Sequence, residues 1–271
     1  MSVAIITGAS SGIGREIAHG LIARGVDEMW LIARREDRLI ALGEELGVKY
    51  KVISADLSTG EGIEALARAL REEKPSVKYF IAAAGFGDFG GFDEISSEVV
   101  EKMIDVNVKA LVLTSHAVLP YMEKGGRLLT LGSASAFTPL PYFNVYAASK
   151  AFVLHYSKAL YYEAKRYGVR VTCFCPGWVH TEFIDKATEN KDVTMPKKGA
   201  FRPLLDCERV VKKCLRALDK GKKLYVTGKF TKMQHLLYKI VPDGLLTRAW
   251  LKMLSAPSDK KNINEPEEKR G

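Results

Sequence analysis

The sequence lacks several features that mark particular classes of protein. No apolar run approaches the ~18 residues that a membrane-spanning helix needs, and MSVAIITGAS at the start has neither the basic segment nor the cleavage site of a signal peptide. The four cysteines offer no disulfide geometry, because Cys173 and Cys175 share one face of an expected strand and Cys207 and Cys214 lie two helical turns apart. No CxxC motif or histidine pair has metal-ligand spacing. We therefore expect a cytoplasmic protein without a metal site.

Acidic residues are scarce in the last quarter of the chain. Residues 197–271 contain 19 Lys and Arg but 8 Asp and Glu, whereas the rest of the chain contains 22 and 24. Such an excess is typical of a solvated face with a tail, and an anionic substrate or an acidic membrane surface is the alternative interpretation. No nucleic-acid-binding motif accompanies the charge, so we expect no nucleic-acid partner.

Short β-branched runs alternate with helical patterns along most of the chain. This alternation predicts a single doubly wound (Rossmann) α/β domain over 1–228, with a seven-stranded, mostly parallel sheet and helices on both faces. Residues 229–254 predict a C-terminal helical extension broken at 242–244, and 255–271 a mobile polar tail. The predicted strands are 3–7, 29–33, 50–54, 79–83, 127–132, 169–175 and 223–227, and the main predicted helices are 12–24, 97–124 and 145–167.

The first predicted strand and helix are joined by the glycine-rich run TGASSGIG. Gly8, Gly12 and Gly14 would allow positive φ angles and a close approach of the backbone to a pyrophosphate. The helix that follows would offer free N–H groups and partial positive charge. The spacing is GxxxGxG rather than GxGxxG, and an ordinary tight turn is the alternative.

Three polar residues that suit catalysis follow later in the chain: Ser133, Tyr146 and Lys150. Tyr146 and Lys150, in YAASK, are four residues apart and share one face of a predicted helix. An ammonium about 4 Å from a phenol favours the phenolate by at most ~4 kcal/mol at an effective dielectric of ~20, so such a tyrosine becomes useful in acid–base chemistry. A surface pair is the alternative. Ser133 follows the fifth strand, at the sheet edge where ligands bind, although it also suits a loop cap.

These motifs occur in a characteristic order: TGASSGIG, Asp56-Leu57, Asn107 in DVNVKA, Ser133, YAASK and Pro176-Gly177. In that order and spacing, residues 1–228 resemble the short-chain dehydrogenase/reductase family. The resemblance implies that Tyr146 is the general acid/base, that Lys150 lowers its pKa and binds the nicotinamide ribose, and that Ser133 orients the substrate oxygen. It implies that Asn107 interrupts a helix and binds a relay water.

The resemblance also implies a set of contacts to a dinucleotide. Asp56 matches the family's contact to the adenine, and Thr181 matches the residue that contacts the carboxamide. One motif departs from the family pattern, because Ala82–Gly85 reads AAAG where NAAG is usual. The expected cofactor residues are Gly8, Ser10, Ser11, Gly12, Ile13, Gly14, Arg34, Arg35, Asp56, Leu57, Ala84, Gly85, Asn107, Tyr146, Lys150, Pro176, Gly177, Val179 and Thr181.

No acidic residue ends the second predicted strand, where an NAD site would place one. The stretch WLIARRED has Ala33, Arg34 and Arg35 there instead. Alanine removes the repulsion of a 2′-phosphate, and the guanidinium of Arg34 can bind its oxygens, so we expect NADP(H). Arg35 either faces solvent or stacks on the adenine, and a charged helix start is the alternative for the pair.

The expected substrate is small and hydrophobic, and the class includes anionic compounds such as bile acids. The segment 137–143 is bulky and apolar, and Ser133, Phe143 and Tyr146 are the expected substrate residues. By analogy with similar branches of the family, we expect a hydroxysteroid or bile acid, with a long-chain 3-oxoacyl thioester as the alternative. A non-catalytic NADP(H)-binding sensor or scaffold is the hypothesis from another class. Residues 181–205 match the family's substrate loop, with basic residues Lys186, Lys191, Lys197, Lys198 and Arg202.

The apolar residues of 229–254 recur at helical spacing, with basic residues between them. A flap over the substrate opening is the first interpretation, and a subunit contact or a weak contact with a membrane surface are the others. The resemblance further implies a homodimer or homotetramer.

Overall fold

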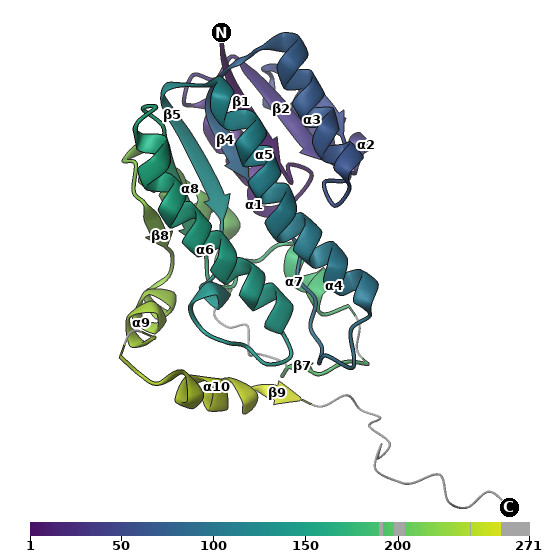
Figure 1. Cartoon of the computed structure of the whole chain (residues 1–271), viewed down its shortest axis with the longest axis vertical. Coiled ribbons are helices and arrows are strands. Elements are labelled where there is room, and N and C mark those ends of the chain that lie inside the picture. The colour runs from purple at the N-terminus through teal and green to yellow at the C-terminus, as the bar shows by residue number, and fades with distance from the viewer. Residues whose placement is uncertain (190–191, 198–203, 239, 256–271) are drawn as a thin grey trace, which may run out of the picture.

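The computed structural model describes residues 1–189, 192–197, 204–238 and 240–255, and a seven-stranded sheet forms its centre (Figure 1). The strands pair in the order β3-β2-β1-β4-β5-β6-β8, and every pairing is parallel. The predicted doubly wound α/β fold is confirmed, with its topological switch between β1 and β4. The strands are β1 (Ser2–Thr7), β2 (Glu28–Ala33), β3 (Lys49–Ser54), β4 (Ser76–Ala82), β5 (Met122–Leu131), β6 (Arg170–Cys175) and β8 (Leu224–Val226).

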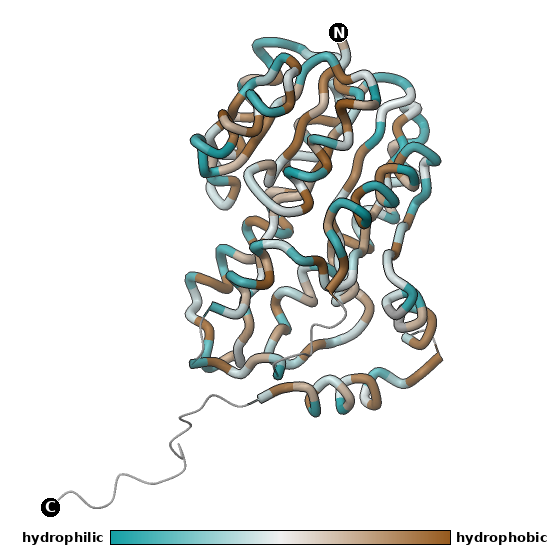
Figure 2. Tube along the Cα trace, turned by 180° about the vertical axis from the view of Figure 1, so that it is seen from behind, coloured by the Kyte–Doolittle hydropathy of each residue, from teal (hydrophilic) through white to brown (hydrophobic). Residues whose placement is uncertain are grey.

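Helices cover both faces of this sheet. Ile5 belongs to the apolar cluster on one face and Ile6 to the cluster on the other, because successive side chains of a strand point in opposite directions. The inner strands are therefore continuously hydrophobic, and appear as brown segments in Figure 2. One layer contains α3 (Gly60–Glu73), α5 (Leu111–Val118) and α6 (Asn144–Lys165), and the other contains α1 (Gly12–Ile22), α2 (Glu36–Leu46) and α8 (Cys207–Asp219).

The single helix predicted over 97–124 is wrong in its interior and at its end. The chain forms α4 (Ser97–Ile104), a π-helical segment (Asp105–Ala110), α5 and a 3-10 turn (Leu119–Tyr121). β5 then begins at Met122, five residues before the predicted start. Met122 pairs with Val77, and the register shifts before Arg127 pairs with Tyr79. Gly125 and Gly126 within this irregular stretch are typical of a turn, which explains the misplaced boundary.

The chain beyond α6 closes the carboxyl edge of the sheet. After α7 (Glu182–Ala187) and β8, helices α9 (Lys229–Leu237) and α10 (Asp243–Leu251) lie below that edge (Figure 1). A two-stranded antiparallel ribbon of β7 (Met195–Pro196) and β9 (Leu254–Ser255) joins the substrate loop to the end of the extension. Among the described residues, no helix has the length and hydrophobicity to cross a bilayer. Lys191, Lys198, Arg202 and the expected tail at 256–271 lie outside the described residues.

Candidate active site

A cavity of about 580 Å³ opens at the carboxyl ends of the parallel strands. It extends from the glycine-rich turn after β1 to the apolar residues of the C-terminal extension. All the cofactor residues expected from the sequence line this cavity except Asn107. We call the part of the cavity beside Gly8–Gly14, Arg34 and Asp56 the dinucleotide half, and the part beside Leu140, Phe183 and Trp250 the substrate half. Ser133, Tyr146 and Lys150 line the cavity as well, and lie where the two halves meet. The sheet topology therefore brings the scattered motifs to one place.

The glycine-rich turn has the shape that a pyrophosphate requires. Gly8 and Gly12 have φ angles of 71° and 55°, which other residues rarely adopt. A Cβ atom on Gly14 would lie 2.3 Å from the Gly8 carbonyl oxygen, so this helix can approach the strand only with glycine there. Within the described chain, α1 has no acidic residue in its first turn and no side-chain cap at Ser11. Its N–H groups are consequently available to an anion.

Tyr146 and Lys150 project from one face of α6, as predicted, and both are buried. The Lys150 ammonium donates a hydrogen bond to the Leu131 carbonyl at 2.8 Å and lies 5.6 Å from the centre of the Tyr146 ring. Ser133 precedes the 3-10 turn Ala134–Phe137, and its hydroxyl accepts a hydrogen bond from the Ser135 amide at 3.1 Å. The three groups converge on one point of the cavity wall.

Burial shifts the pKa values of both Tyr146 and Lys150. Burial raises the pKa of Tyr146, and a hydrogen bond with Ser133 offsets only part of that increase. Burial also lowers the pKa of Lys150 to about 8. Burial therefore dominates the pKa of Tyr146 in this arrangement, where the Lys150 ammonium is bound to the Leu131 carbonyl, and the expected lowering of that pKa by Lys150 stays a prediction.

Asn107 braces the site rather than lining it. Its side chain, in the π-helical segment, accepts a hydrogen bond from the Phe86 amide at 3.0 Å and donates one to the Phe86 carbonyl at 2.8 Å. It also donates to the Ser149 hydroxyl at 3.0 Å. A Cβ atom on Gly85 would lie 2.9 Å from the Asn107 amide oxygen, so glycine is required beside it. Asn107 does not line the large cavity, and its expected contact with the cofactor stays a prediction.

A small cavity lies beside Ala82, where the family usually has the asparagine of NAAG. Ala82 lines an internal cavity of about 10 Å³ together with Thr7 and Asn107, roughly the size of one water molecule. The Thr7 hydroxyl accepts a hydrogen bond from the Ala84 amide at 3.3 Å and donates one to the Ile81 carbonyl at 3.5 Å. These bonds, with those of Asn107, support the end of β4 without the asparagine that the family usually has.

Replacing Ala82 with asparagine is expected to stabilise the protein. The amide would fill the hole beside Thr7 and Asn107 and regain about one hydrogen bond, which raises the free energy of unfolding by ~1 kcal/mol. Urea denaturation measures the change. Ala83→Asn is the matched control, because Ala83 faces the apolar cluster under α1 and the same substitution there should destabilise. A loss of stability in Ala82→Asn would contradict this account of the hole.

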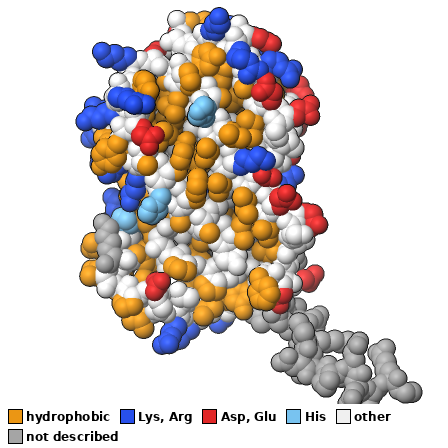
Figure 3. Space-filling model, in the orientation of Figure 1, with side chains coloured by type: hydrophobic (Ala, Val, Ile, Leu, Met, Phe, Trp, Pro, Cys, Tyr) orange, Lys and Arg blue, Asp and Glu red, His pale blue; other side chains and the backbone are white. Residues whose placement is uncertain are grey.

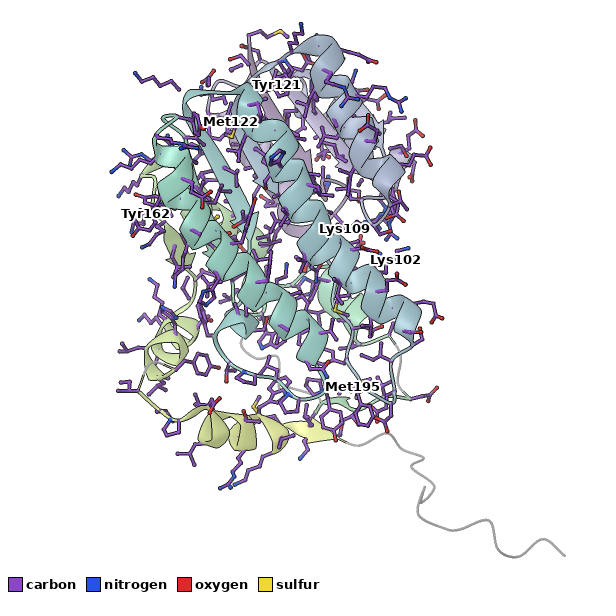
Figure 4. All side chains as sticks on the ribbon, in the orientation of Figure 1. Lys102, Lys109, Tyr121, Met122, Tyr162 and Met195 are labelled. Carbon is purple, nitrogen blue, oxygen red and sulfur yellow. The ribbon has the colours of Figure 1, made fainter. Side chains whose placement is uncertain are left out.

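The other end of the dinucleotide half is strongly basic. Arg34, Arg35 and Lys102 all line it, and Lys102 reaches it from α4 (Figure 4). Asp56 lies 3.4 Å from the Lys102 ammonium and 3.9 Å from the Arg34 guanidinium. Burial would raise the pKa of Asp56, but hydrogen bonds from Ser58 and these two cations lower it overall. Asp56 is therefore ionised and leaves a net positive surface for an anion.

Arg35 neither faces solvent nor stands free to stack, which corrects the expectation for it. Its guanidinium donates hydrogen bonds to the Ser10 hydroxyl at 3.2 Å and to the Glu182 carboxylate at 2.9 Å. Arg38 binds the same carboxylate. Arg35 is thereby positioned against the glycine-rich turn, and Arg34, with a more exposed side chain, keeps its guanidinium accessible.

The substrate half is walled by large apolar side chains. Phe143, expected on this wall, lies behind Tyr146 instead, its ring stacked 3.9 Å from Phe89 and 4.4 Å from Tyr146. The Trp250 indole donates a hydrogen bond to the Pro141 carbonyl at 2.8 Å and so fixes α10 over the opening. Trp250 belongs to the extension that was interpreted as a flap over the substrate opening. Residues of the cavity wall that sequence reasoning did not identify are Asp88, Trp178, Phe183, Thr231, Tyr238 and Met253, and Lys102 at the basic end.

Comparison with known proteins identifies the family. The model of the short chain dehydrogenase family matches residues 2–192, the region that forms the glycine-rich turn and the Ser133–Tyr146–Lys150 cluster. The chain belongs to this family. It is an oxidoreductase by that membership, and Ser133, Tyr146 and Lys150, which belong to the motifs that suggested the resemblance, line its cavity.

This short-chain dehydrogenase has relatives of several kinds. An uncharacterised oxidoreductase of Staphylococcus epidermidis is 34% identical over 206 residues, 75% of this chain and 87% of the relative. A hydroxysteroid dehydrogenase-like protein 1 of Gallus gallus is 31% identical over 207 residues, 73% of this chain and 62% of that protein. A solved short-chain dehydrogenase from Sphingobium yanoikuyae, in complex with NADPH, is 26% identical with a TM-score of 0.75, and the match covers 98% of this chain and 99% of that one.

Proposed function

We propose that this protein transfers a hydride between NADP(H) and a ketone or secondary alcohol on a bulky hydrophobic substrate, with hydroxysteroids as the substrate class. The observation that carries the proposal is the single cavity, in which a basic dinucleotide half and an apolar half meet at Tyr146. A small polar substrate would leave the walls formed by Leu140, Phe183 and Trp250 facing water.

The residues of the first half fit a dinucleotide. Gly8, Gly12 and Gly14 leave backbone space for a pyrophosphate, and the start of α1 supplies N–H donors to it. Asp56 would contact the adenine, and Thr181 and Lys150 border the nicotinamide end. When bound, the nicotinamide supplies or accepts the hydride.

The protein's own groups manage the proton and the developing charge. In the reductive direction Tyr146 gives its phenolic proton to the carbonyl oxygen, and the Ser133 hydroxyl donates a hydrogen bond to the same oxygen. The Lys150 ammonium lies close enough to the Tyr146 ring to stabilise the phenolate that results. Burial limits the access of water to this proton transfer, since Tyr146 is 7% exposed and Lys150 is 3% exposed.

Ketone reduction is expected to lose rate on the basic side of neutrality. The raised pKa of Tyr146 keeps its phenol protonated, while Lys150, with a pKa of about 8, is charged below that pH and neutral above it. The parameter kcat/KM reports such ionisations of the free enzyme, so it should be level near pH 7 and fall by up to about tenfold per pH unit above about pH 8. A profile that stays level to about pH 10 would be inconsistent with this role of Lys150.

The choice of substrate class has two sources of support. The apolar wall suits a rigid hydrocarbon skeleton, and a relative 31% identical is named a hydroxysteroid dehydrogenase-like protein. Long-chain 3-oxoacyl thioesters are the alternative, favoured by Lys186 on the cavity wall, which would attract an anionic carrier group. A panel of steroids, bile acids and 3-oxoacyl thioesters, assayed with both NADPH and NADH, separates the two. Turnover of none of these compounds would refute the substrate class, and NADPH binding without turnover of any carbonyl compound would favour a non-catalytic sensor.

We also propose that the protein forms a homodimer or homotetramer through α5 and α6. Figure 3 shows hydrophobic side chains over the face that these helices present in Figure 1. Leu113 and Phe152 are both more than 40% exposed there, and Phe152 stacks on Tyr156. Sedimentation equilibrium tests the assembly, and Phe152→Glu should yield monomers by introducing a charge into the contact.

A further inference from the structure

The two helices of the C-terminal extension have different inner and outer sides. Inward, Thr231 of α9, Tyr238 just after it and Trp250 of α10 line the cavity. Outward, large apolar side chains face solvent with exposed fractions above one half, where a helix of a globular protein normally presents polar residues. These outward residues are Met233 (53%), Leu236 (59%), Ile240 (73%) and Leu245 (56%).

Basic side chains surround this apolar surface. Residues 229–255 contain five Lys and Arg and one acidic residue, Asp243. Within the described part of the chain, no carboxylate forms an ion pair with the exposed basic residues of the two helices. Those residues are Lys229, Lys232, Arg248 and Lys252. Figure 3 shows hydrophobic and basic side chains together at the lower edge, where α10 lies in Figure 1.

We propose that α9, α10 and Ile240 between them dock on the surface of an anionic phospholipid bilayer. The apolar side chains would enter the boundary between headgroups and acyl chains, and the lysines and arginines would bind lipid phosphates and carboxylates. A second copy of this chain is a poorer occupant, because a two-fold contact would place identical positively charged surfaces against each other. The proposal does not depend on the reaction that the cavity performs.

Docking in this way places the cavity wall next to the membrane. Tyr238, just after α9, and Trp250, in α10, belong to the same extension as the outward residues, so only the thickness of the extension separates the cavity from the lipid. Lys197 ties this segment to the substrate loop, since its amide donates a hydrogen bond to the Met253 carbonyl at 2.8 Å. The docked surface is therefore attached to the rest of the protein near the C-terminal end of α10, through the Trp250–Pro141 hydrogen bond and through the ribbon.

Vesicle sedimentation with the full chain tests the proposal. We expect binding to phosphatidylcholine vesicles that contain phosphatidylserine, weak binding to phosphatidylcholine alone, and loss of binding as salt increases. Lys229→Gln/Lys232→Gln should weaken the partition coefficient by about tenfold or more, since each basic residue near the surface contributes ~1 kcal/mol. Leu236→Ser/Ile240→Ser should weaken it at least as much, because both side chains lose their apolar burial in the lipid.

Two matched pairs on other helices serve as controls. Lys212→Gln/Lys213→Gln on α8 removes the same charge, and Ile22→Ser/Ile40→Ser alters one exposed isoleucine on α1 and one on α2. Both pairs should bind as the parent does, with all variants matched in melting temperature. Equal sedimentation with both kinds of vesicle, or equal loss in the control pairs, would overturn the proposal. The unmodified protein could instead self-associate without binding vesicles, and lose that self-association in Leu236→Ser/Ile240→Ser. This result would overturn the proposal and identify a second copy of the chain as the partner of this surface.

Discussion

Tyr146→Phe is expected to abolish carbonyl reduction while NADPH still binds. The phenol is the only group at the meeting point of the two cavity halves that we assign to donate a proton, and a positioned acid contributes roughly 10²–10⁴-fold to such a rate. The ring itself remains, so its packing against Phe143, at 4.4 Å, and Phe183, at 5.3 Å, is preserved. Steady-state turnover and NADPH fluorescence titration measure the two effects separately.

Tyr156→Phe is the matched control for this loss. Tyr156 lies ten residues further along α6, packs against the core under the sheet and does not line the cavity. Its substitution removes the same hydroxyl from the same helix and should leave kcat nearly unchanged. Retained turnover in Tyr146→Phe, with Tyr156→Phe equally active, would mean that the proton comes from another group.

Arg34→Asp should reduce or reverse the preference for NADPH. The unmodified protein is expected to favour NADPH over NADH by at least about tenfold in kcat/KM, or ~1.4 kcal/mol. A carboxylate at position 34 would lie beside Asp56 and repel a 2′-phosphate, while Arg35 keeps its bonds to Ser10 and Glu182. The ratio of kcat/KM values with the two cofactors measures the change.

Arg38→Asp distinguishes this local effect from a general change in charge. Arg38 also belongs to this basic group and binds Glu182, but it does not line the cavity. The substitution Arg38→Asp makes the same change in net charge as Arg34→Asp. It should largely preserve the ratio of kcat/KM values with NADPH and NADH. Equal use of NADPH and NADH by the unmodified protein would show that the basic end of the cavity does not recognise a 2′-phosphate.

The fold follows from the sequence where both faces of an element are constrained. β1 is apolar at every position from Val3 to Ile6, because both of its faces are covered, and such a run is unambiguous. β7 and β9 were not predicted, since two residues each are too few for a periodic pattern. The π-helical segment around Asn107 was implied only by the family resemblance, because its hydrogen bonds to Phe86 are tertiary.

The site was predictable where a residue acts through backbone geometry or through one helix face. Gly8, Gly14 and the Tyr146–Lys150 pair lie where the motifs placed them. Side chains that meet across the fold were not foreseen: Lys102 approaches Asp56 from a helix 46 positions later in the chain. The helical period of 229–254 predicted an amphipathic extension, but no pattern within it tells which side faces the cavity. The orientation of the extension depends on the turn after β8 and on the hydrogen bond from Trp250 to the Pro141 carbonyl.

The β7–β9 ribbon has a consequence for how the protein is made. Chains leave the ribosome from the N-terminus, and compact units fold as they emerge. All seven strands of the sheet, and with them the glycine-rich turn and Tyr146, precede residue 229 in the chain. β9 pairs with β7 across about 60 residues, and Met195 finds its partner Ser255 only after α9 and α10 have been synthesised. During translation the residues of the dinucleotide cleft are therefore all available before α9, α10 and β9 emerge and complete the apolar end of the cavity.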